Sequence, residues 1–151
     1  MRNGILILGL TLAMGTVRMA KAADDCSLLT PAQIQQVLGQ PFNAPDKSQA
    51  PPAFRNQPAG SHCRYSSQKS HGTVDFIVYV DASASAAKQT FEQLQMWYPA
   101  KSRPSGIGDS AYIDSHNSIH VLKGKVRYFI SLAPENEKQL KDLAISVAAH
   151  I

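Results

Sequence analysis

Cysteine is scarce in this sequence, and long apolar runs are missing from it. Its two cysteines, Cys26 and Cys63, are too far apart to form a CxxC motif of the redox or zinc-binding kind. The apolar stretch near the N-terminus is interrupted by Arg18, well short of the roughly 20 residues that a membrane-spanning helix requires. No Gly-x-Ser-x-Gly elbow occurs, so the nucleophile signature of the α/β-hydrolases is absent. The length of 151 residues predicts one domain.

Acidic residues are absent from the first 22 positions. Arg2 precedes an uncharged apolar run of about ten residues, and the Ala-Lys-Ala tripeptide at 20–22 places small residues where a signal peptidase requires them. We therefore expect a signal peptide over residues 1–22, cleaved after Ala22, and a single mature domain over 23–151. The mature protein is expected in the periplasm or outside the cell, without a stable membrane anchor.

Two further observations concern lipid attachment and nucleic-acid binding. Asp24 and Asp25 stand before Cys26, where a lipid-attachment motif needs small apolar residues, so lipidation is not expected. The chain carries 15 Lys and Arg against 11 Asp and Glu, but three of the basic residues lie within 1–22. The 12 that remain face 11 acids, a net of +1. A nucleic-acid partner is therefore not expected, because the basic footprint is missing.

Export changes the interpretation of the two cysteines, since oxidising compartments allow disulfides to persist. A structural bond between Cys26 and Cys63 is the preferred interpretation. A redox pair or a pair of metal ligands is the alternative, and each would need additional groups that the sequence does not mark out.

Helical periodicity predicts three helices. Thr30-Pro31-Ala32-Gln33 is a capping box and Gly39 suits a left-handed terminator, which together predict a helix over 31–38. Ser83 is the expected cap of a second helix that runs to about residue 98. A third helix is expected over 135–151, with acidic residues at its favourable N-terminal end.

Alternating apolar residues predict five strands, over 63–66, 73–81, 110–113, 118–123 and 125–132. Short polar or glycine-containing turns join them, so hairpins and an antiparallel sheet are expected. The order is helix, two strands, helix, three strands, helix. This is an α+β fold with about five strands, and its helices are expected to cover one face of the sheet.

The segment 43–61 is rich in proline and lacks periodicity, which predicts a long loop. Phe54 at its centre is interpreted as packing on the sheet, with a recognition tip as the alternative. Trp97, the only tryptophan, is interpreted as core packing, with partner contact as the alternative. Lys101 and Arg103 follow it and would suit an acidic partner.

Signals for metal binding or phosphate binding are weak. Gly106-Ile107-Gly108 precedes a strand and not a helix, so we interpret it as a turn. A zinc or copper site would need histidines at chelating positions, and the expected turn and strand placement of two of them does not give the helical i, i+4 geometry. The histidines considered are His62, His71, His116 and His120. No catalytic residue, cofactor or metal is expected.

Four segments carry a resemblance that spans most of the mature chain. They are Cys26-Ser27-Leu28-Leu29-Thr30-Pro31-Ala32-Gln33, Cys63-Arg64-Tyr65, Gly106-Ile107-Gly108-Asp109-Ser110-Ala111-Tyr112 and the Lys123-Gly124 turn. The chain resembles a family of small exported bacterial proteins and cell-envelope lipoproteins whose domain has no assigned function. The resemblance implies an α+β domain in which a cysteine pair links the start of the first helix to the first strand, with no catalytic residues to transfer.

The combined observations predict a non-enzymatic periplasmic or secreted domain that binds another envelope component or a ligand through a loop-rich edge. An inhibitor of a secreted hydrolase is the alternative within the binding class. A small hydrolase or metal-binding protein is the alternative outside it.

Overall fold

A computed structural model of the chain describes residues 25–151, and the predicted signal peptide lies outside these residues. The elements, in chain order, are η1 (Asp25–Leu28), α1 (Pro31–Leu38), β1 (Asp46–Ala50), β2 (Gly60–Ser66), β3 (Thr73–Val80), α2 (Ala84–Trp97), β4 (Ala100–Ser102), β5 (Ser110–Asp114), β6 (Ile119–Lys123), β7 (Val126–Ala133) and α3 (Glu137–Ala148). Among these residues no helix has the length and apolar character needed to cross a bilayer.

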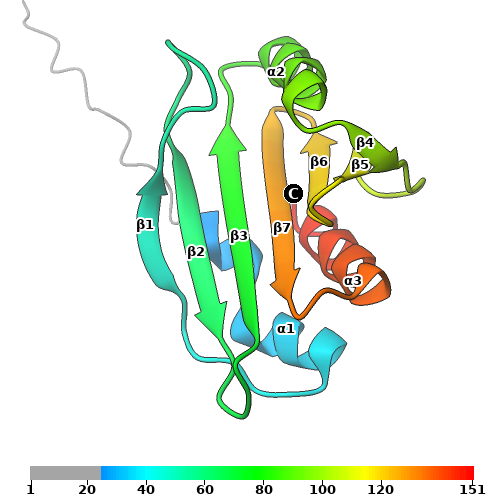
Figure 1. Ribbon diagram of the computed structural model, residues 1–151. Coiled ribbons are helices and arrows are strands. Elements are labelled where there is room, and N and C mark those ends of the chain that lie inside the picture. The colour runs from blue at the N-terminus through cyan, green and yellow to red at the C-terminus, as the bar shows by residue number, and fades with distance from the viewer. Residues whose placement is uncertain (1–24) are drawn as a thin grey trace, which may run out of the picture.

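The strands form one antiparallel sheet in the order β1-β2-β3-β7-β6-β5-β4 (Figure 1). The predicted α+β class is confirmed, but the expectation of about five strands is wrong, because the sheet has seven. The two strands that the sequence did not indicate, β1 and β4, form its edges. Four of the five residues of β1 are exposed and β4 has only three residues, so neither carries an alternating apolar pattern. The predicted loop over 43–61 is therefore interrupted by β1.

One face of the sheet packs against η1, α1 and α3 to form the main core. Val74, Phe76 and Val78 alternate along β3 and are fully buried on this face. Ile34 of α1 and Leu143 of α3 are fully buried against them. The helices supply the apolar stripes that the sequence predicts, and α3 begins at Glu137 because Asn136 caps it through the backbone N–H of Gln139.

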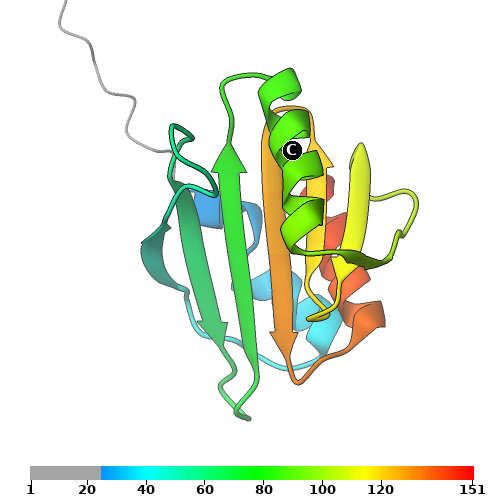
Figure 2. The ribbon, with the colours of Figure 1, turned by 45° about the horizontal axis from the view of Figure 1, so that its top comes forward.

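Helix α2 lies on the opposite face of the sheet, in front of it in Figure 2, whereas α1 and α3 lie behind. The expectation that the helices cover one face is therefore wrong. Ala87 and Phe91 of α2 pack on Tyr112 and Leu122 of the sheet, in a small second cluster of buried side chains. The ring centroids of Phe91 and Tyr112 are 5.2 Å apart in an edge-to-face arrangement. Among the described residues, no helix lies over β1, β2 and β3 on this face (Figure 2).

The disulfide between Cys26 and Cys63 is confirmed, with Cα atoms 5.7 Å apart. Both cysteines are buried in the main core. Beside them the hydroxyl of Tyr65 donates to the carbonyl oxygens of Cys26 (3.1 Å) and Leu29. The bond and this hydroxyl hold η1, and the start of α1 that follows it, against β2.

Reduction of this disulfide should lower the free energy of unfolding by about 3–4 kcal/mol, because it releases a loop of 37 residues in the unfolded chain. Urea unfolding with and without dithiothreitol measures the difference. The Cys26→Ala/Cys63→Ala variant is the control and should not respond to the reductant. A wild-type difference below about 1 kcal/mol would show that the bond adds little to the fold.

Candidate functional site

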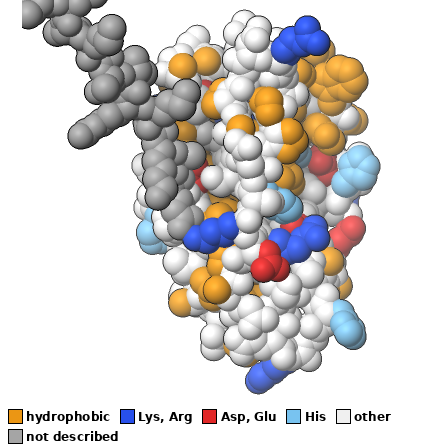
Figure 3. All heavy atoms as spheres, turned by 90° about the vertical axis from the view of Figure 1, so that its left-hand side faces the viewer, with side chains coloured by type: hydrophobic (Ala, Val, Ile, Leu, Met, Phe, Trp, Pro, Cys, Tyr) orange, Lys and Arg blue, Asp and Glu red, His pale blue; other side chains and the backbone are white. Residues whose placement is uncertain are grey.

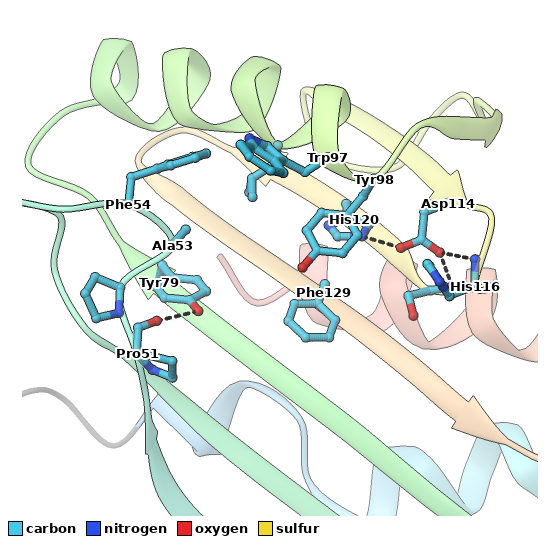
Figure 4. A pocket seen from close by; sticks show the side chains of 13 residues that line it. Pro51, Ala53, Phe54, Tyr79, Trp97, Tyr98, Asp114, His116, His120 and Phe129 are labelled. Carbon is cyan, nitrogen blue, oxygen red and sulfur yellow. Dashed lines mark hydrogen bonds and ion pairs between the residues drawn. The ribbon is translucent and has the colours of Figure 1, made fainter.

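A pocket of about 740 Å³ lies on the α2 face of the sheet, within the size range of small-molecule sites. Three parts of the chain surround it: the segment after β1, the C-terminal half of α2 with Tyr98, and the strands β3, β5, β6 and β7 with the β5–β6 turn. The lining residues are Pro51, Pro52, Ala53, Phe54, Tyr79, Leu94, Trp97, Tyr98, Asp114, His116, Ser118, His120 and Phe129. Figure 4 shows the side chains of this pocket.

Trp97 and Tyr98 form one wall of the pocket. Tyr98 descends from the end of α2 toward His120 and Phe129 on the sheet, and the indole of Trp97 lies beside α2, facing Phe54 (Figure 4). Trp97 is 71% exposed, so the interpretation that it packs in the core is wrong. Trp97 is not part of the buried cluster that Ala87 and Phe91 form with the sheet, and its indole lines the pocket instead. Tyr98 stacks on His120 with a ring-centroid distance of 5.6 Å and remains 42% exposed.

Phe54 forms part of the opposite wall and is half-buried. Its ring points toward α2 and Trp97 (Figure 4). Both ends of its segment are anchored. The hydroxyl of Tyr79 donates to the carbonyl oxygen of Pro51 (3.0 Å), and Nε2 of Gln57 donates to Oγ1 of Thr90 on α2 (2.6 Å).

The floor of the pocket depends on a close approach at Gly60. A Cβ atom there would lie 2.7 Å from the ring of Tyr79 and 2.6 Å from the carbonyl oxygen of Val78, so only glycine leaves room for this ring. The guanidinium carbon of Arg127 lies 4.9 Å from the centroid of the Tyr79 ring. Nε and Nη2 of Arg127 bind Asp81 at 2.6 and 3.1 Å, and both side chains of this ion pair are buried.

The polar end of the pocket is organised by Asp114. Its Oδ1 accepts from the backbone N–H groups of His116 (2.9 Å) and Ser118 (3.0 Å), and its Oδ2 lies 2.9 Å from Nε2 of His120. Burial alone would raise the pKa of Asp114, but these hydrogen bonds outweigh it and hold the pKa below its ordinary value. Because the ionised carboxylate can only accept, His120 carries its proton on Nε2.

His120 is buried within a row of aromatic rings. Its ring stacks on Tyr112 at a centroid distance of 4.5 Å and on Phe129 at 5.5 Å. Burial lowers the pKa of His120, and the neighbouring Asp114 only partly offsets this. His120 is therefore neutral at pH 7, and its Nδ1 is a bare acceptor.

The two predicted basic contacts lie outside the pocket. Lys101 and Arg103 are exposed and hydrogen-bond to neighbours, Lys101 to Oδ1 of Asn117 (2.7 Å) and Arg103 to Oε1 of Gln95 (2.6 Å). No lysine or arginine from the described part of the chain lines the pocket. The structure thus brings Phe54 and Trp97 together in one site and leaves the two basic residues away from it.

The four histidines do not converge. His116 lies in a turn and His120 on a strand, as predicted, whereas His71 is exposed on another turn. Within residues 25–151 no group of three or more His, Cys, Asp or Glu side chains is arranged to hold a metal ion. Gly106 and Gly108 both have positive φ, 76° and 58°, which confirms the predicted turn.

Sequence reasoning missed a polar row on β1, β2 and β3. Oγ of Ser48 lies 3.4 Å from Nδ1 of His62, whose Nε2 lies 2.7 Å from Oδ1 of Asp75. Residues 48 and 62 are paired across β1 and β2. Their contact could be predicted only if the register between these two strands were known. Arg64 also binds both carboxylate oxygens of Asp75, at 2.8 and 3.2 Å, which makes this row a cross-strand ion-pair network.

No family model, curated protein or solved structure matches the chain. The described part of the chain is an α+β domain with an aromatic-walled pocket on the sheet face opposite its main core.

Burial of neutral His120 predicts that stability falls as the pH is lowered. The pKa of His120 is lower in the folded chain than its ordinary value of about 6.5, so the unfolded chain binds the extra proton first. The free energy of unfolding should therefore decline between pH 7 and pH 5, as urea titrations at each pH would show. His120→Phe should flatten this slope and His71→Gln should not. Equal slopes in the wild type and His120→Phe would contradict the assignment.

Gly60→Ala should displace the ring of Tyr79 and lower the free energy of unfolding by about 1–3 kcal/mol through overpacking. Ser66→Ala, at the far end of the same strand, is the matched control and should change it by less than about 0.5 kcal/mol. Urea unfolding of both variants measures the effect. Two variants as stable as the wild type would show that Tyr79 does not depend on this close approach.

Proposed function

We propose that the protein is an exported, non-enzymatic binding domain that holds an apolar, ring-bearing group in the pocket between α2, the segment 51–54 and the sheet. The predicted signal peptide and the disulfide between Cys26 and Cys63 support export, since such bonds persist in oxidising compartments. The resemblance to exported cell-envelope proteins supports the envelope as the place where the ligand is met.

One observation carries this proposal: aromatic side chains from distant parts of the chain face the same open pocket. Phe54, Trp97 and Tyr98 form its walls, and Tyr79 and Phe129 form its floor. An indole that is 71% exposed above an apolar pocket gains free energy when a ligand covers it, because aromatic rings bury large areas on contact. Figure 3, seen from the β1 edge, shows hydrophobic side chains gathered at the end of the molecule that carries α2.

The polar groups of the pocket are held in place by one another. Both oxygens of Asp114 accept hydrogen bonds, so its carboxylate fixes the β5–β6 turn and the ring of His120. Ser118 lines the pocket, and its backbone N–H is the group that contacts Asp114. The anchored ends of the 51–57 segment preform the walls, and this lowers the entropic cost of binding.

The sole tryptophan makes the proposal directly testable. N-phenyl-1-naphthylamine, a neutral probe whose emission rises in apolar surroundings, should bind saturably to the mature protein. Trp97→Ala should weaken its binding about tenfold or more, which corresponds to the loss of one well-packed aromatic contact.

Met96→Ala is the matched control. Met96 is the neighbouring residue and is equally exposed, at 76%, but it does not line the pocket. Its removal should leave the affinity within about twofold of the wild type. Binding that is absent, or equally weakened by the two substitutions, would contradict the proposal.

A further inference from the structure

The aromatic pocket contains a carboxylate whose charge no partner neutralises. Asp114 is the only acidic residue of the described chain that lines the pocket, and no described lysine or arginine lines it. Hydrogen bonds keep the pKa of Asp114 below its ordinary value, so the carboxylate is ionised at pH 7. Its partners are two backbone N–H groups and the neutral ring of His120, and none of these carries a charge.

The charges next to the pocket offset one another. Arg127 lies beside the floor, but it is engaged by Asp81 through two hydrogen bonds, and this buried pair has no net charge. At the β5–β6 turn, Lys101 and Glu135 both hydrogen-bond to the side chain of Asn117, so one positive and one negative charge meet there. Neither group cancels the charge of Asp114.

Two further arginines lie near the walls. Arg55 follows Phe54, and Arg103 binds Gln95 of α2, but both arginines are exposed and neither lines the pocket. Water and salt screen exposed charges, whereas the buried carboxylate of Asp114 is screened much less. The pocket therefore has a negative potential, which favours a positively charged ligand.

The aromatic walls favour the same sign of charge. The face of an aromatic ring attracts a cation, and tryptophan is the strongest partner of this kind. Trp97, Tyr98 and Phe54 form the walls, and the indole of Trp97 is 71% exposed. The floor already shows such a contact, because the guanidinium of Arg127 lies 4.9 Å from the centroid of the Tyr79 ring. Rings and carboxylate thus act together on a bound cation.

The lack of free carboxylate oxygens indicates which kind of cation fits. A primary ammonium has three N–H donors that need acceptors when water is removed. Both oxygens of Asp114 already accept hydrogen bonds, and its side chain is buried. A quaternary ammonium has no N–H group, and its methyl groups bury apolar surface against the rings.

We infer that the ligand is a ring-bearing organic cation whose ammonium nitrogen is fully alkylated and lies among the aromatic walls of the pocket, in the field of Asp114. The inference rests on the proposed function, because the pocket must first bind a ring-bearing group. It adds the charge and the substitution of the nitrogen that distinguish the ligand from other molecules with rings.

A series of matched benzyl compounds tests this by displacement of N-phenyl-1-naphthylamine from the mature protein at pH 7. Benzyltrimethylammonium is compared with neopentylbenzene, which has the same shape and no charge. Phenylmethanesulfonate is the anionic analogue, and benzylammonium is the primary ammonium. Each compound carries a para-hydroxymethyl group for solubility. The trimethylammonium compound should bind about tenfold tighter than the neopentyl compound, and the sulfonate and the primary ammonium should both bind more weakly than it does.

Two variants separate the contributions of ring and charge. Trp97→Leu keeps an apolar side chain without an aromatic face, and Asp114→Asn removes the charge with little change in shape. Each should lower the ratio of trimethylammonium to neopentyl affinity about threefold or more. Met96→Leu, at an exposed neighbour outside the pocket, should leave the ratio unchanged. Trp97 is exposed, so its variant retains the fold even if Asp114→Asn does not.

The outcomes distinguish failure of the inference from failure of the proposed function. If N-phenyl-1-naphthylamine does not bind, the proposed function is overturned and the cation inference with it. If the probe binds but the neopentyl compound or the sulfonate displaces it as well as the trimethylammonium compound does, the binding function stands and the cation inference is overturned. Tighter binding of the primary ammonium, or an affinity ratio that Trp97→Leu leaves unchanged, would also overturn it.

Discussion

The register between β3 and β7 determines what each face of the sheet does. Val78 is paired with Tyr128, and both side chains enter the main core, whereas the next pair, Tyr79 and Arg127, lies on the pocket face. Side chains alternate along a strand, so a slip of one residue would exchange the two sets. The main core, the floor of the pocket and the buried ion pair therefore depend on the same pairing.

The two faces are sealed to different degrees. Three helical segments and the disulfide close the main core, and its largest residues are fully buried. The α2 face has a small buried cluster, an open pocket and unpaired polar atoms. Regions with few apolar contacts open at low free-energy cost, and ligand-binding elements are drawn from them. The face that carries the main core thus supplies the stable scaffold, and the α2 face is the less tightly packed one on which we propose the binding site.

Local signals in the sequence were sufficient for the helices and the inner strands. Thr30 and Gln33 form the expected capping box and Gly39 the left-handed terminator, so α1 has the predicted bounds. The edge strands were missed because backbone pairing, and not an apolar pattern, holds them. The bonds that anchor β1 and the segment after it, such as that from Tyr79 to Pro51, join residues far apart in the sequence.

The pocket could not be predicted because its residues are brought together only by the sheet order and by the position of α2. Helical periodicity places Trp97 at the edge of the apolar face of α2, and it does not decide whether an edge residue packs in the core or stays exposed. One signal was present: Ile77, Tyr79 and Phe129 are large side chains on the strand face opposite the core residues. Apolar residues occur at both the odd-numbered and the even-numbered positions of β3 and β7, which indicates that both faces of these strands are packed against other groups.

The central claim is that the aromatic pocket of the α2 face is where this protein binds its ligand. Amide and indole chemical-shift mapping with N-phenyl-1-naphthylamine tests it most directly. The account predicts that the indole N–H of Trp97 and the amides of His120 and Phe129 shift in a saturable way, while the amides of α1 and α3 remain unchanged. Shifts centred on α1 and α3, or no shift at the Trp97 indole, would contradict it.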